Sequence, residues 1–345
     1  MTTVLDQSAV RDTATAYALL DLIQGSVITQ AISVAAKLGI ADALAGGPLP
    51  AEVIAERVGA DPGATYRLLR ALSGYSVFAV RPDGTFELTP MSDALRDDAP
   101  DSMRGMAALM SHPLHWEEFG HLVESVRTGE ANLPKLRGMG AFEFFPKNPE
   151  YAGAFFQAFG NLSESETEPV LAAYDFAQFG KIVDVGGGRG RLLAGILAKA
   201  PDATGVLFDG EQTTADAPRL FEAAGVSERV TIANGTYFDA LPAGGDAYLL
   251  KHTLHDFPAA EQVAILRNVG KAIAPGGKLL VIEYVLNGSN ERHIGNVIDL
   301  WLLLFLGVQE RTLPEYTELF AEAGFSTVRS IPTGAPISII EAVPA

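Results

Sequence analysis

Apolar and polar residues alternate along the C-terminal half of the chain in a pattern that predicts strands and helices in turn. Short apolar runs of strand length are separated by longer segments of helical composition. The expected strands are 182–185, 205–208, 230–233, 247–250, 279–283 and 338–342, with 327–331 as a further candidate. Regular alternation of this kind predicts an α/β domain with a mostly parallel sheet and helices on both faces.

The N-terminal segment has the pattern of closely packed helices. Apolar residues between 14 and 45 are too many for one helix face in water, so this segment is buried in its own core or against a second subunit. We favour a homodimer. Two short helices are expected at 49–59 and 62–72, and a hairpin with an Asp-Gly turn at 77–89. Helix, helix and hairpin together predict a mostly helical, winged-helix-like domain.

Winged-helix domains often bind DNA, and that alternative depends on charge. The segment 51–90 holds four Lys or Arg residues against five Asp or Glu residues, whereas a DNA reader needs a basic face. We therefore expect this domain to serve dimerisation and substrate enclosure rather than nucleic-acid binding.

The segment 101–170 is mainly helical and rich in aromatic residues, and 163–173 is expected to be a connecting helix. Trp116 and Phe159 are candidates for lining a substrate pocket, although packing in the core explains them equally well. The chain is thus divided into a dimerisation domain at 1–100, a helical linker and pocket wall at 101–170, and a catalytic α/β domain at 171–345.

Composition narrows the classes of function. The 345-residue chain carries a net charge of −17, a field that repels nucleic acid and anionic membranes. It contains no cysteine, which excludes disulfides, thiolate metal sites and a cysteine nucleophile. The segment Met1–Gln7 lacks the features of a secretory signal, and we find no apolar run of membrane-spanning length. A cytoplasmic location is expected.

A glycine-rich turn at 186–190 follows the first strand of the α/β domain. Such a turn occurs in many α/β proteins, but here an acid, Asp184, stands just before it. The spacing is not the G-x-G-x-x-G that seats a pyrophosphate, and the acid suits a ligand with an ammonium or sulfonium charge. Asp209 closes the next strand, where it can bond ribose hydroxyls.

Several polar residues share the carboxyl edge of the predicted sheet, where such folds bind ligands. They are Asp184, Asp209, Thr236, Lys251 and Glu283.

His255 follows the fourth strand at this edge, and its ordinary pKa suits a general base near neutral pH. Either Glu283 or Glu310 could orient its ring. His252 is the competing base, but we expect it to point elsewhere.

These motifs, taken together, resemble the S-adenosylmethionine-dependent O-methyltransferases of the plant caffeate and flavonoid type and their bacterial relatives that tailor antibiotics. The motifs are 183–190, Phe208-Asp209, 250–256, 310–312 and 323–325, and the segments 38–42 and 66–72 resemble the family's dimerisation domain. The resemblance covers nearly the whole chain. It implies a Rossmann-like catalytic domain and a homodimer.

The resemblance also implies roles by position. The family's general base falls on His255, with Glu283 and Glu310 as supporting carboxylates. Cofactor contacts are implied for a set of residues at the strand ends: Asp184, Gly186, Gly188, Asp209, Gly235, Thr236, Tyr237 and Lys251. Gly186 would lie at the methionine moiety, and Thr236 and Tyr237 would flank the adenine.

Three positions depart from the family pattern. Thr236 stands where an aspartate is usual, so the resemblance implies the loss of one contact to the adenine. Phe257 replaces a tryptophan. The segment 299–302 offers Trp301 in place of a methionine that packs on the acceptor, which predicts a differently shaped acceptor pocket, and Asp299 is a further candidate for substrate binding.

The implied reaction is an in-line displacement in which His255 deprotonates an acceptor hydroxyl, the oxygen attacks the methyl group, and S-adenosylhomocysteine leaves. No metal is required, and the acceptor is expected to be a phenolic aromatic compound. Two alternatives remain open. A family member could use the cofactor pocket for hydroxylation, decarboxylation or pericyclic chemistry, and a winged-helix regulator could sense a small molecule.

Overall fold

The computed structural model describes residues 13–99, 102–288 and 290–345. These form two compact units, Met1–Trp116 with Glu150–Leu162, and Glu117–Pro149 with Ser163–Ala345. The three-part division at residues 100 and 170 stays a prediction. The prediction that Met1–Gln7 contains no secretory signal peptide falls on residues outside the described part of the chain.

The first unit contains the predicted helices and hairpin. Its elements are α1 (Thr13–Leu38), α2 (Ile40–Ala43), α3 (Ala51–Val58), α4 (Pro62–Gly74), β1 (Phe78–Val80), β2 (Phe86–Leu88), α5 (Pro90–Asp93) and α6 (Arg104–Leu109). Asp61 caps α4 by accepting a hydrogen bond from the Ala64 amide at 2.8 Å, and Pro62 occupies the first turn. The strands of the hairpin pair antiparallel.

Helix α1 corrects one expectation. By length and composition it could cross a membrane. Its large apolar residues do not form one continuous run, but the small and hydroxyl residues between them keep the mean hydropathy of the helix high. Only 11% of its most apolar window is buried. Large apolar side chains therefore remain exposed along it: Tyr17, Leu19, Leu20, Leu22, Ile23 and Val27.

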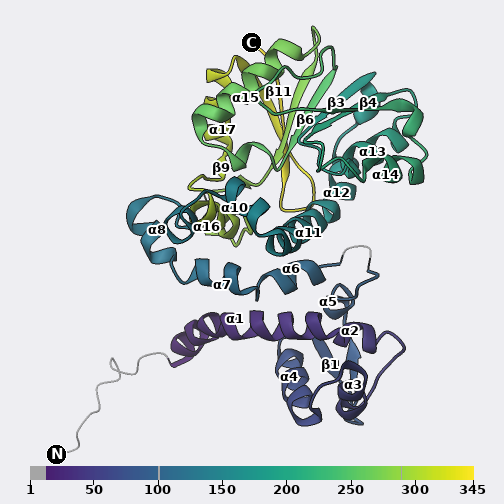
Figure 1. Cartoon of the computed structure of the whole chain (residues 1–345), viewed down its shortest axis with the longest axis vertical. Coiled ribbons are helices and arrows are strands. Elements are labelled where there is room, and N and C mark those ends of the chain that lie inside the picture. The colour runs from purple at the N-terminus through teal and green to yellow at the C-terminus, as the bar shows by residue number, and fades with distance from the viewer. Residues whose placement is uncertain (1–12, 100–101, 289) are drawn as a thin grey trace, which may run out of the picture. The chain divides into compact units, whose positions relative to one another are not determined.

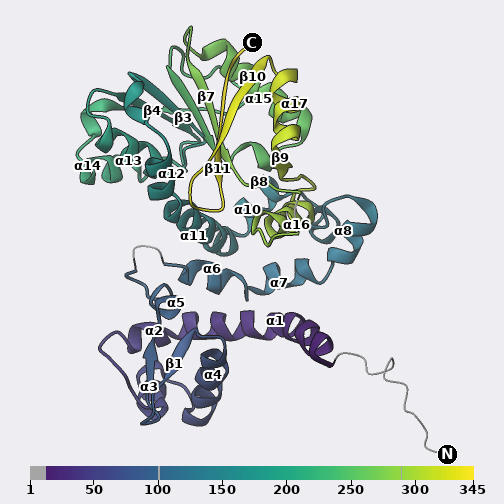
Figure 2. The ribbon, with the colours of Figure 1, turned by 180° about the vertical axis from the view of Figure 1, so that it is seen from behind.

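Seven strands form one sheet in the second unit (Figures 1 and 2). They are β3 (Lys181–Val185), β4 (Thr204–Asp209), β5 (Val230–Asn234), β6 (Ala247–Lys251), β7 (Lys278–Glu283), β10 (Phe325–Pro332) and β11 (Ser338–Pro344). Their spatial order is β10-β11-β7-β6-β3-β4-β5. The five strands from β3 to β7 are parallel, and β11 pairs antiparallel with both β7 and β10. All seven expected strands are confirmed.

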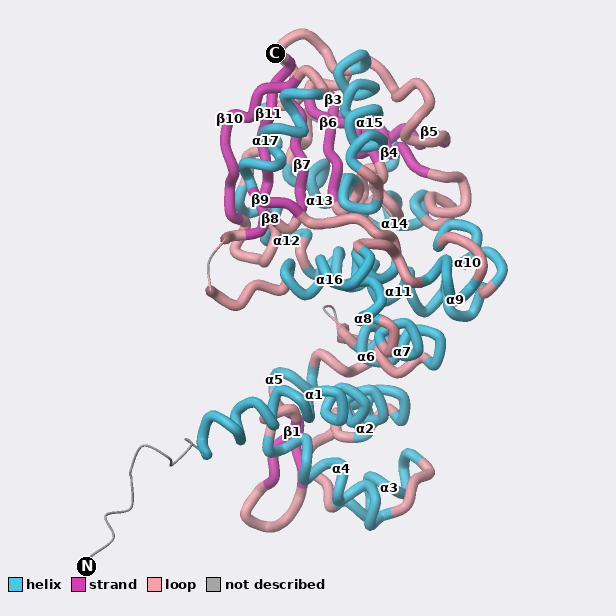
Figure 3. The backbone as a smooth tube through the Cα atoms, turned by 90° about the vertical axis from the view of Figure 1, so that its left-hand side faces the viewer, coloured by secondary structure: helices cyan, strands magenta, loops and turns pink. Residues whose placement is uncertain are grey.

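Helices cover both faces of this sheet, as Figure 3 also shows. The helices of the second unit, or shared with the first, are α7 (Pro113–Phe119), α8 (Leu122–Thr128), α9 (Leu133–Arg137), α10 (Ala141–Lys147), α11 (Pro149–Ser165), α12 (Thr167–Ala173), α13 (Arg191–Lys199), α14 (Ala217–Ala223), α15 (Ala259–Ala272), α16 (Gly295–Phe305) and α17 (Leu313–Glu322). Strand residues alternate between two cores, because successive side chains point to opposite faces. Ile182 packs with α13, and Val183 belongs to the core that includes α15 and α17.

Two short features hold the loops beyond the carboxyl ends of the strands. A 3-10 turn, Leu254–Asp256, follows β6. The two-residue strands β8 (Val285–Leu286) and β9 (Arg311–Thr312) pair in parallel and were not expected from the sequence. This pairing ties the chain after β7 to the segment that carries Glu310.

Candidate active site

The glycine-rich turn lies directly over Asp184. A methyl group added at Gly187 would lie 2.5 Å from Oδ2 of Asp184, so only glycine fits there. The Asp184 side chain is buried, and among the described residues its Oδ2 has no hydrogen-bond partner. Burial and the nearby charge of Asp209 raise the pKa of Asp184 to about 7. A buried acid without a partner at a sheet edge indicates a ligand site.

Asp209 ends β4 beside the same turn. Its Oδ2 accepts a hydrogen bond from the Gly188 amide at 2.9 Å. Gly188 has a φ of +60°, a conformation that glycine adopts without strain, and this aims its amide at the acid. Burial raises the pKa of Asp209. The structure therefore joins Asp184, Gly188 and Asp209 around one turn.

Two loops approach the turn closely at Gly186. A methyl group there would lie 2.7 Å from Thr253 Oγ1 and 3.0 Å from Tyr237 Oη. The Tyr237 ring packs edge-on against Phe257, with centroids 5.3 Å apart. Phe257, which stands where the family usually has a tryptophan, thus holds Tyr237 at the turn.

Gly235 and Thr236, which also follow β5, make contacts within the protein itself. Thr236 is exposed, and both its amide and its hydroxyl donate to Asp239, at 3.1 and 2.8 Å. A methyl group at Gly235 would lie 2.8 Å from the ring of Phe208. Cofactor contacts of Gly235 and Thr236 stay predictions.

Lys251 is buried in an ion pair with Glu166. Its ammonium lies 2.7 Å from Glu166 Oε2 and donates to the Ser163 carbonyl at 3.0 Å. The sequence predicts one continuous helix over 163–173, which is wrong, because α11 ends at Ser165 and α12 begins at Thr167. Glu166 lies at that break. Its position between Glu164 and Glu168 in a polar stretch gave no signal that it would be buried.

His255 faces both carboxylates that the sequence left as alternatives. Its Nδ1 lies 2.8 Å from Glu310 Oε1 and 3.2 Å from Glu283 Oε2. Glu283 Oε1 accepts from the amides of Thr253 and Leu254, at 2.9 and 3.1 Å, which fixes the carboxylate. Burial lowers the pKa of His255, but the charges of Glu283 and Glu310 outweigh it and raise the pKa to about 10. The ordinary pKa assumed from sequence is therefore wrong for this environment.

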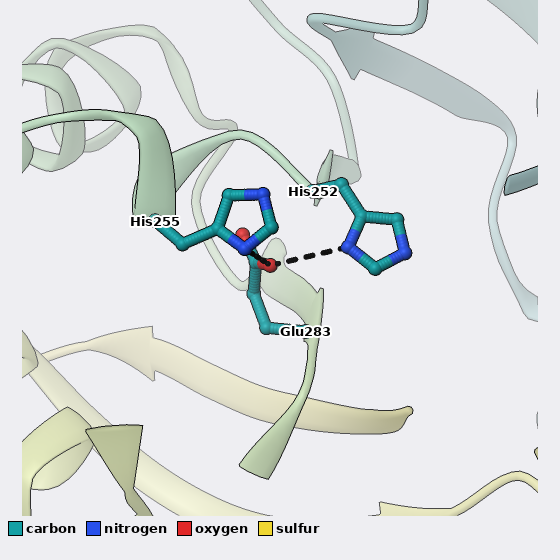
Figure 4. A group of neighbouring side chains, drawn as sticks. All are labelled: His252, His255 and Glu283. Carbon is teal, nitrogen blue, oxygen red and sulfur yellow. Dashed lines mark ion pairs between the residues drawn. The ribbon is translucent and has the colours of Figure 1, made fainter. Parts of the chain in front are cut away.

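His252 also reaches this cluster, contrary to expectation. Its Nδ1 lies 3.5 Å from Glu283 Oε2, and its Nε2 lies 2.7 Å from Glu166 Oε2. The two imidazole rings stack with centroids 5.3 Å apart (Figure 4). A φ of +49° at His252 explains the error, because the left-handed backbone turns this side chain inward. His252, His255 and Glu283 offer ligand atoms that all lie within 4.8 Å of one another. Spacing in the sequence did not reveal this group.

The candidates for acceptor binding fall into both units. Asp299 Oδ1 accepts a hydrogen bond from the Glu310 amide at 2.7 Å, so Asp299 positions the loop that carries Glu310. Trp301 packs edge-on against Phe119, with centroids 5.6 Å apart. Trp116, which is 42% exposed, and Phe159, which packs against Phe155, belong to the first unit. Substrate contacts of all four candidates stay predictions.

Comparisons with known proteins agree with this architecture. The family model described as the O-methyltransferase domain matches residues 119–326, and the O-methyltransferase dimerisation domain matches residues 20–98. The seven-stranded sheet, the buried acids at its edge and these matches define an S-adenosylmethionine-dependent methyltransferase.

Individual relatives cover almost the full chain. The phenazine O-methyltransferase PhzM of Lysobacter antibioticus is 38% identical over 94% of this chain and 95% of its own. The 8-amino-8-demethylriboflavin N,N-dimethyltransferase of Streptomyces davaonensis is 36% identical over 89% of each. The structure of NcsB1 from neocarzinostatin biosynthesis, solved with S-adenosylmethionine and 2-hydroxy-5-methyl naphthoic acid, is 34% identical, with a TM-score of 0.74 over 92% of this chain and 96% of NcsB1. The chain belongs to the O-methyltransferase family.

Proposed function

We propose that the protein transfers a methyl group from S-adenosylmethionine to a phenolic hydroxyl of an aromatic secondary metabolite, with His255 as the general base. The observation that carries this proposal is the pair of buried carboxylates, Glu310 and Glu283, at 2.8 and 3.2 Å from Nδ1 of His255. A proton held on Nδ1 by these carboxylates leaves Nε2 to take the proton of the acceptor.

The residues at the glycine-rich turn fit the cofactor. Asp184 offers a buried oxygen without a hydrogen-bond partner to a positively charged group, and the missing side chain of Gly186 lets Thr253 and Tyr237 approach the backbone of the turn. Asp209 is the candidate for the ribose hydroxyls, with Gly188 holding its carboxylate. When bound, the cofactor supplies an electrophilic methyl group on a sulfonium centre. Tyr237 would then close the adenine side.

His255 supplies the proton step in this scheme. Its Nε2 removes the hydroxyl proton while the acceptor oxygen attacks the methyl group in line, and S-adenosylhomocysteine is the second product. The scheme uses no metal. With a pKa near 10, the ring of the free protein is an imidazolium at neutral pH. A positively charged cofactor disfavours that cation, and turnover should therefore rise with pH until the ring is neutral.

Aromatic acceptors are supported by the relatives and by the chain. NcsB1 was solved with a hydroxylated naphthoic acid, and PhzM is named for a phenazine. Trp301 and Phe119 form an aromatic pair in the catalytic unit, and we propose Trp301 as a pocket residue. Trp116 and Phe159, which belong to the first unit, stay candidates for substrate contact. A second candidate is an aromatic amine, because one relative is an N,N-dimethyltransferase. A neutral amine has a free lone pair, so its methylation would depend less on His255.

We further propose that the protein is a homodimer through α1. The apolar side chains exposed on that helix need a cover, and the family's dimerisation domain matches residues 20–98. A cytoplasmic location stays a prediction.

Calorimetric titration with S-adenosylmethionine and S-adenosylhomocysteine tests the cofactor proposal. We expect binding that Asp209→Ala abolishes and that Asp202→Ala, at an exposed position, retains. Absence of binding in the unaltered protein would overturn the proposal.

Incubation with a panel of phenols and anilines, followed by mass spectrometry, then tests the acceptor and the base. We expect His255→Ala to abolish methylation of phenols while S-adenosylhomocysteine still binds. Unchanged turnover of phenols in that variant would remove His255 from the base role. If the variant no longer methylates phenols but still methylates anilines, amine methylation would be an activity that does not depend on His255.

A further inference from the structure

Three side chains beyond the carboxyl ends of β6 and β7 converge on one point (Figure 4). Nδ1 of His252 and Nδ1 of His255 lie 3.5 and 3.2 Å from the same oxygen, Glu283 Oε2. Zinc bonds to nitrogen and oxygen of roughly 2.0–2.2 Å place two ligands of a tetrahedral site about 3.3–3.5 Å apart. The two nitrogen-to-oxygen separations therefore already match those of ligands around one such ion, and all three ligand atoms lie within 4.8 Å of one another.

The outer contacts of two of these ligands match those of a metal site. Glu283 Oε1 is held by the amides of Thr253 and Leu254, which leaves Oε2 to face the imidazoles. His252 is bonded through Nε2 to Glu166 Oε2 at 2.7 Å, and its other nitrogen faces the cluster. A carboxylate behind a histidine is the usual arrangement that orients an imidazole toward a metal ion.

Charge and unmet bonding favour a cation at this point. Glu166, Glu283 and Glu310 bring three carboxylates together against the ammonium of Lys251 and the imidazolium of His255, whose Nδ1 proton a bound ion would displace. Among the described residues, Oε2 of Glu310 is buried and has no hydrogen-bond partner, and Oε2 of Glu283 is buried with only the two imidazole nitrogens as ion-pair partners. Two imidazoles with carboxylate oxygens suit Zn²⁺ and similar transition metals better than Mg²⁺ or Ca²⁺, which prefer oxygen ligands alone.

We infer that His252, His255 and Glu283 bind a divalent transition metal ion of the Zn²⁺ type, and that this ion switches off His255 as a base. Binding of the ion follows from the geometry alone, whereas the switch rests on the proposed function. Glu310, whose Oε1 lies 2.8 Å from Nδ1 of His255, is placed to supply a fourth ligand. The side chains of His252 and His255 are 17% and 10% exposed, whereas the Glu283 side chain is fully buried.

The switch follows from the two nitrogens of one ring. An ion on Nδ1 of His255 takes the lone pair of that nitrogen and releases its proton to solvent, and the remaining ring proton stays on Nε2. The ring then has no free lone pair with which to accept the proton of an acceptor. An ion bound to Nδ1 therefore prevents Nε2 from acting as a base, although the ion does not contact Nε2.

The test measures binding apart from turnover. The full chain, freed of metal with a chelator, is titrated with Zn²⁺ against a chromophoric chelator and with Co²⁺, whose visible absorption is intense in four-coordinate sites. We expect one ion per chain and a loss of affinity of about 100-fold or more in His252→Gln. His121→Gln removes an exposed histidine outside the cluster and is the matched control. S-adenosylhomocysteine binding checks that each variant is folded.

Two further measurements connect the ion to activity. Methyl transfer should be lost as Zn²⁺ is added and recover with chelator, and His252→Gln should require a higher Zn²⁺ concentration for the same loss. Equal affinity in the unaltered protein and His252→Gln, or no binding, would overturn the site. Binding without inhibition would overturn the switch. If the chelator-treated protein binds Zn²⁺ but methylates no acceptor before Zn²⁺ is added, the metal site would stand and the proposed function would be refuted.

Discussion

Asp184→Asn tests the idea that a buried charge is kept for a ligand at a cost in stability. An unfolded aspartate has a pKa of about 3.9, and burial raises that of Asp184 to about 7 in the folded protein. Below the unfolded pKa the aspartate is protonated in both the folded and the unfolded protein. Between the two pKa values it ionises in the unfolded protein but stays largely protonated in the folded one. Folding is therefore progressively penalised as the pH rises through 7, and the full difference corresponds to roughly 4 kcal/mol.

The asparagine variant removes this pH-dependent penalty. The side chain still buries an amide, which carries a cost of its own that does not change with pH. We therefore compare how the difference in free energy of unfolding between the variant and the unaltered protein changes with pH, because the cost of burying the amide is the same at every pH. We expect the stability of Asp184→Asn relative to the unaltered protein to increase by roughly 2 kcal/mol between about pH 5.5 and pH 8.5.

Urea denaturation of the ligand-free protein at several pH values measures this difference. Asp202→Asn is the control, because that exposed residue should show no such trend. The variant should also bind S-adenosylmethionine more weakly, since the charge that faces the ligand is gone. A stability difference that is constant with pH would refute the assignment of a buried, ionisable Asp184, and unchanged cofactor affinity would refute its role as a ligand residue.

Three other changes give distinct results. Glu310→Gln should lower the apparent pKa of kcat/KM by about 1.5 pH units when metal is chelated, because one of the carboxylates that raise the pKa of His255 loses its charge. Gly186→Ala should abolish cofactor binding, because its methyl group would meet Thr253 Oγ1 at 2.7 Å; calorimetry measures this. Ile23→Glu, which places a charge on the exposed face of α1, should give monomers in sedimentation velocity.

Each of these has a control at an exposed site. Glu261→Gln should leave the pH profile unchanged, Gly288→Ala should leave cofactor binding unchanged, and Val328→Glu should leave the association state unchanged. An unaltered pH profile in Glu310→Gln would contradict the electrostatic account of His255. Full cofactor affinity in Gly186→Ala would contradict the need for a glycine at this position, and a stable dimer in Ile23→Glu would contradict the α1 interface.

The positions of the strands and of most candidate residues could be predicted, because they depend on local sequence. Apolar runs of strand length located the parallel sheet, and strand ends located Asp209 and His255 at its edge. The hairpin with its Asp-Gly turn and the capped helix α4 depend on interactions a few residues apart. Such features are determined by the residues themselves.

Side-chain partners across the chain could not be predicted in the same way. Glu166 meets Lys251 and His252 over 85 and 86 residues of sequence, and nothing in its local pattern marks it. The hydrogen bond from the Glu310 amide to the carboxylate of Asp299 was likewise not predicted, and acceptor binding by Asp299 stays a prediction. The error over His252 came from one left-handed backbone angle that no periodicity encodes.

The sequence by itself determined the α/β sheet, the family resemblance and the presence of a histidine and acids at the sheet edge, because hydrophobic periodicity and motif spacing are local properties. Only the tertiary structure decided that both Glu283 and Glu310 face His255, that the pKa of this ring is raised to about 10, and that His252 completes a group able to bind a metal ion. Those properties depend on distances of a few ångströms and on burial, which arise only when remote strands and loops pack together.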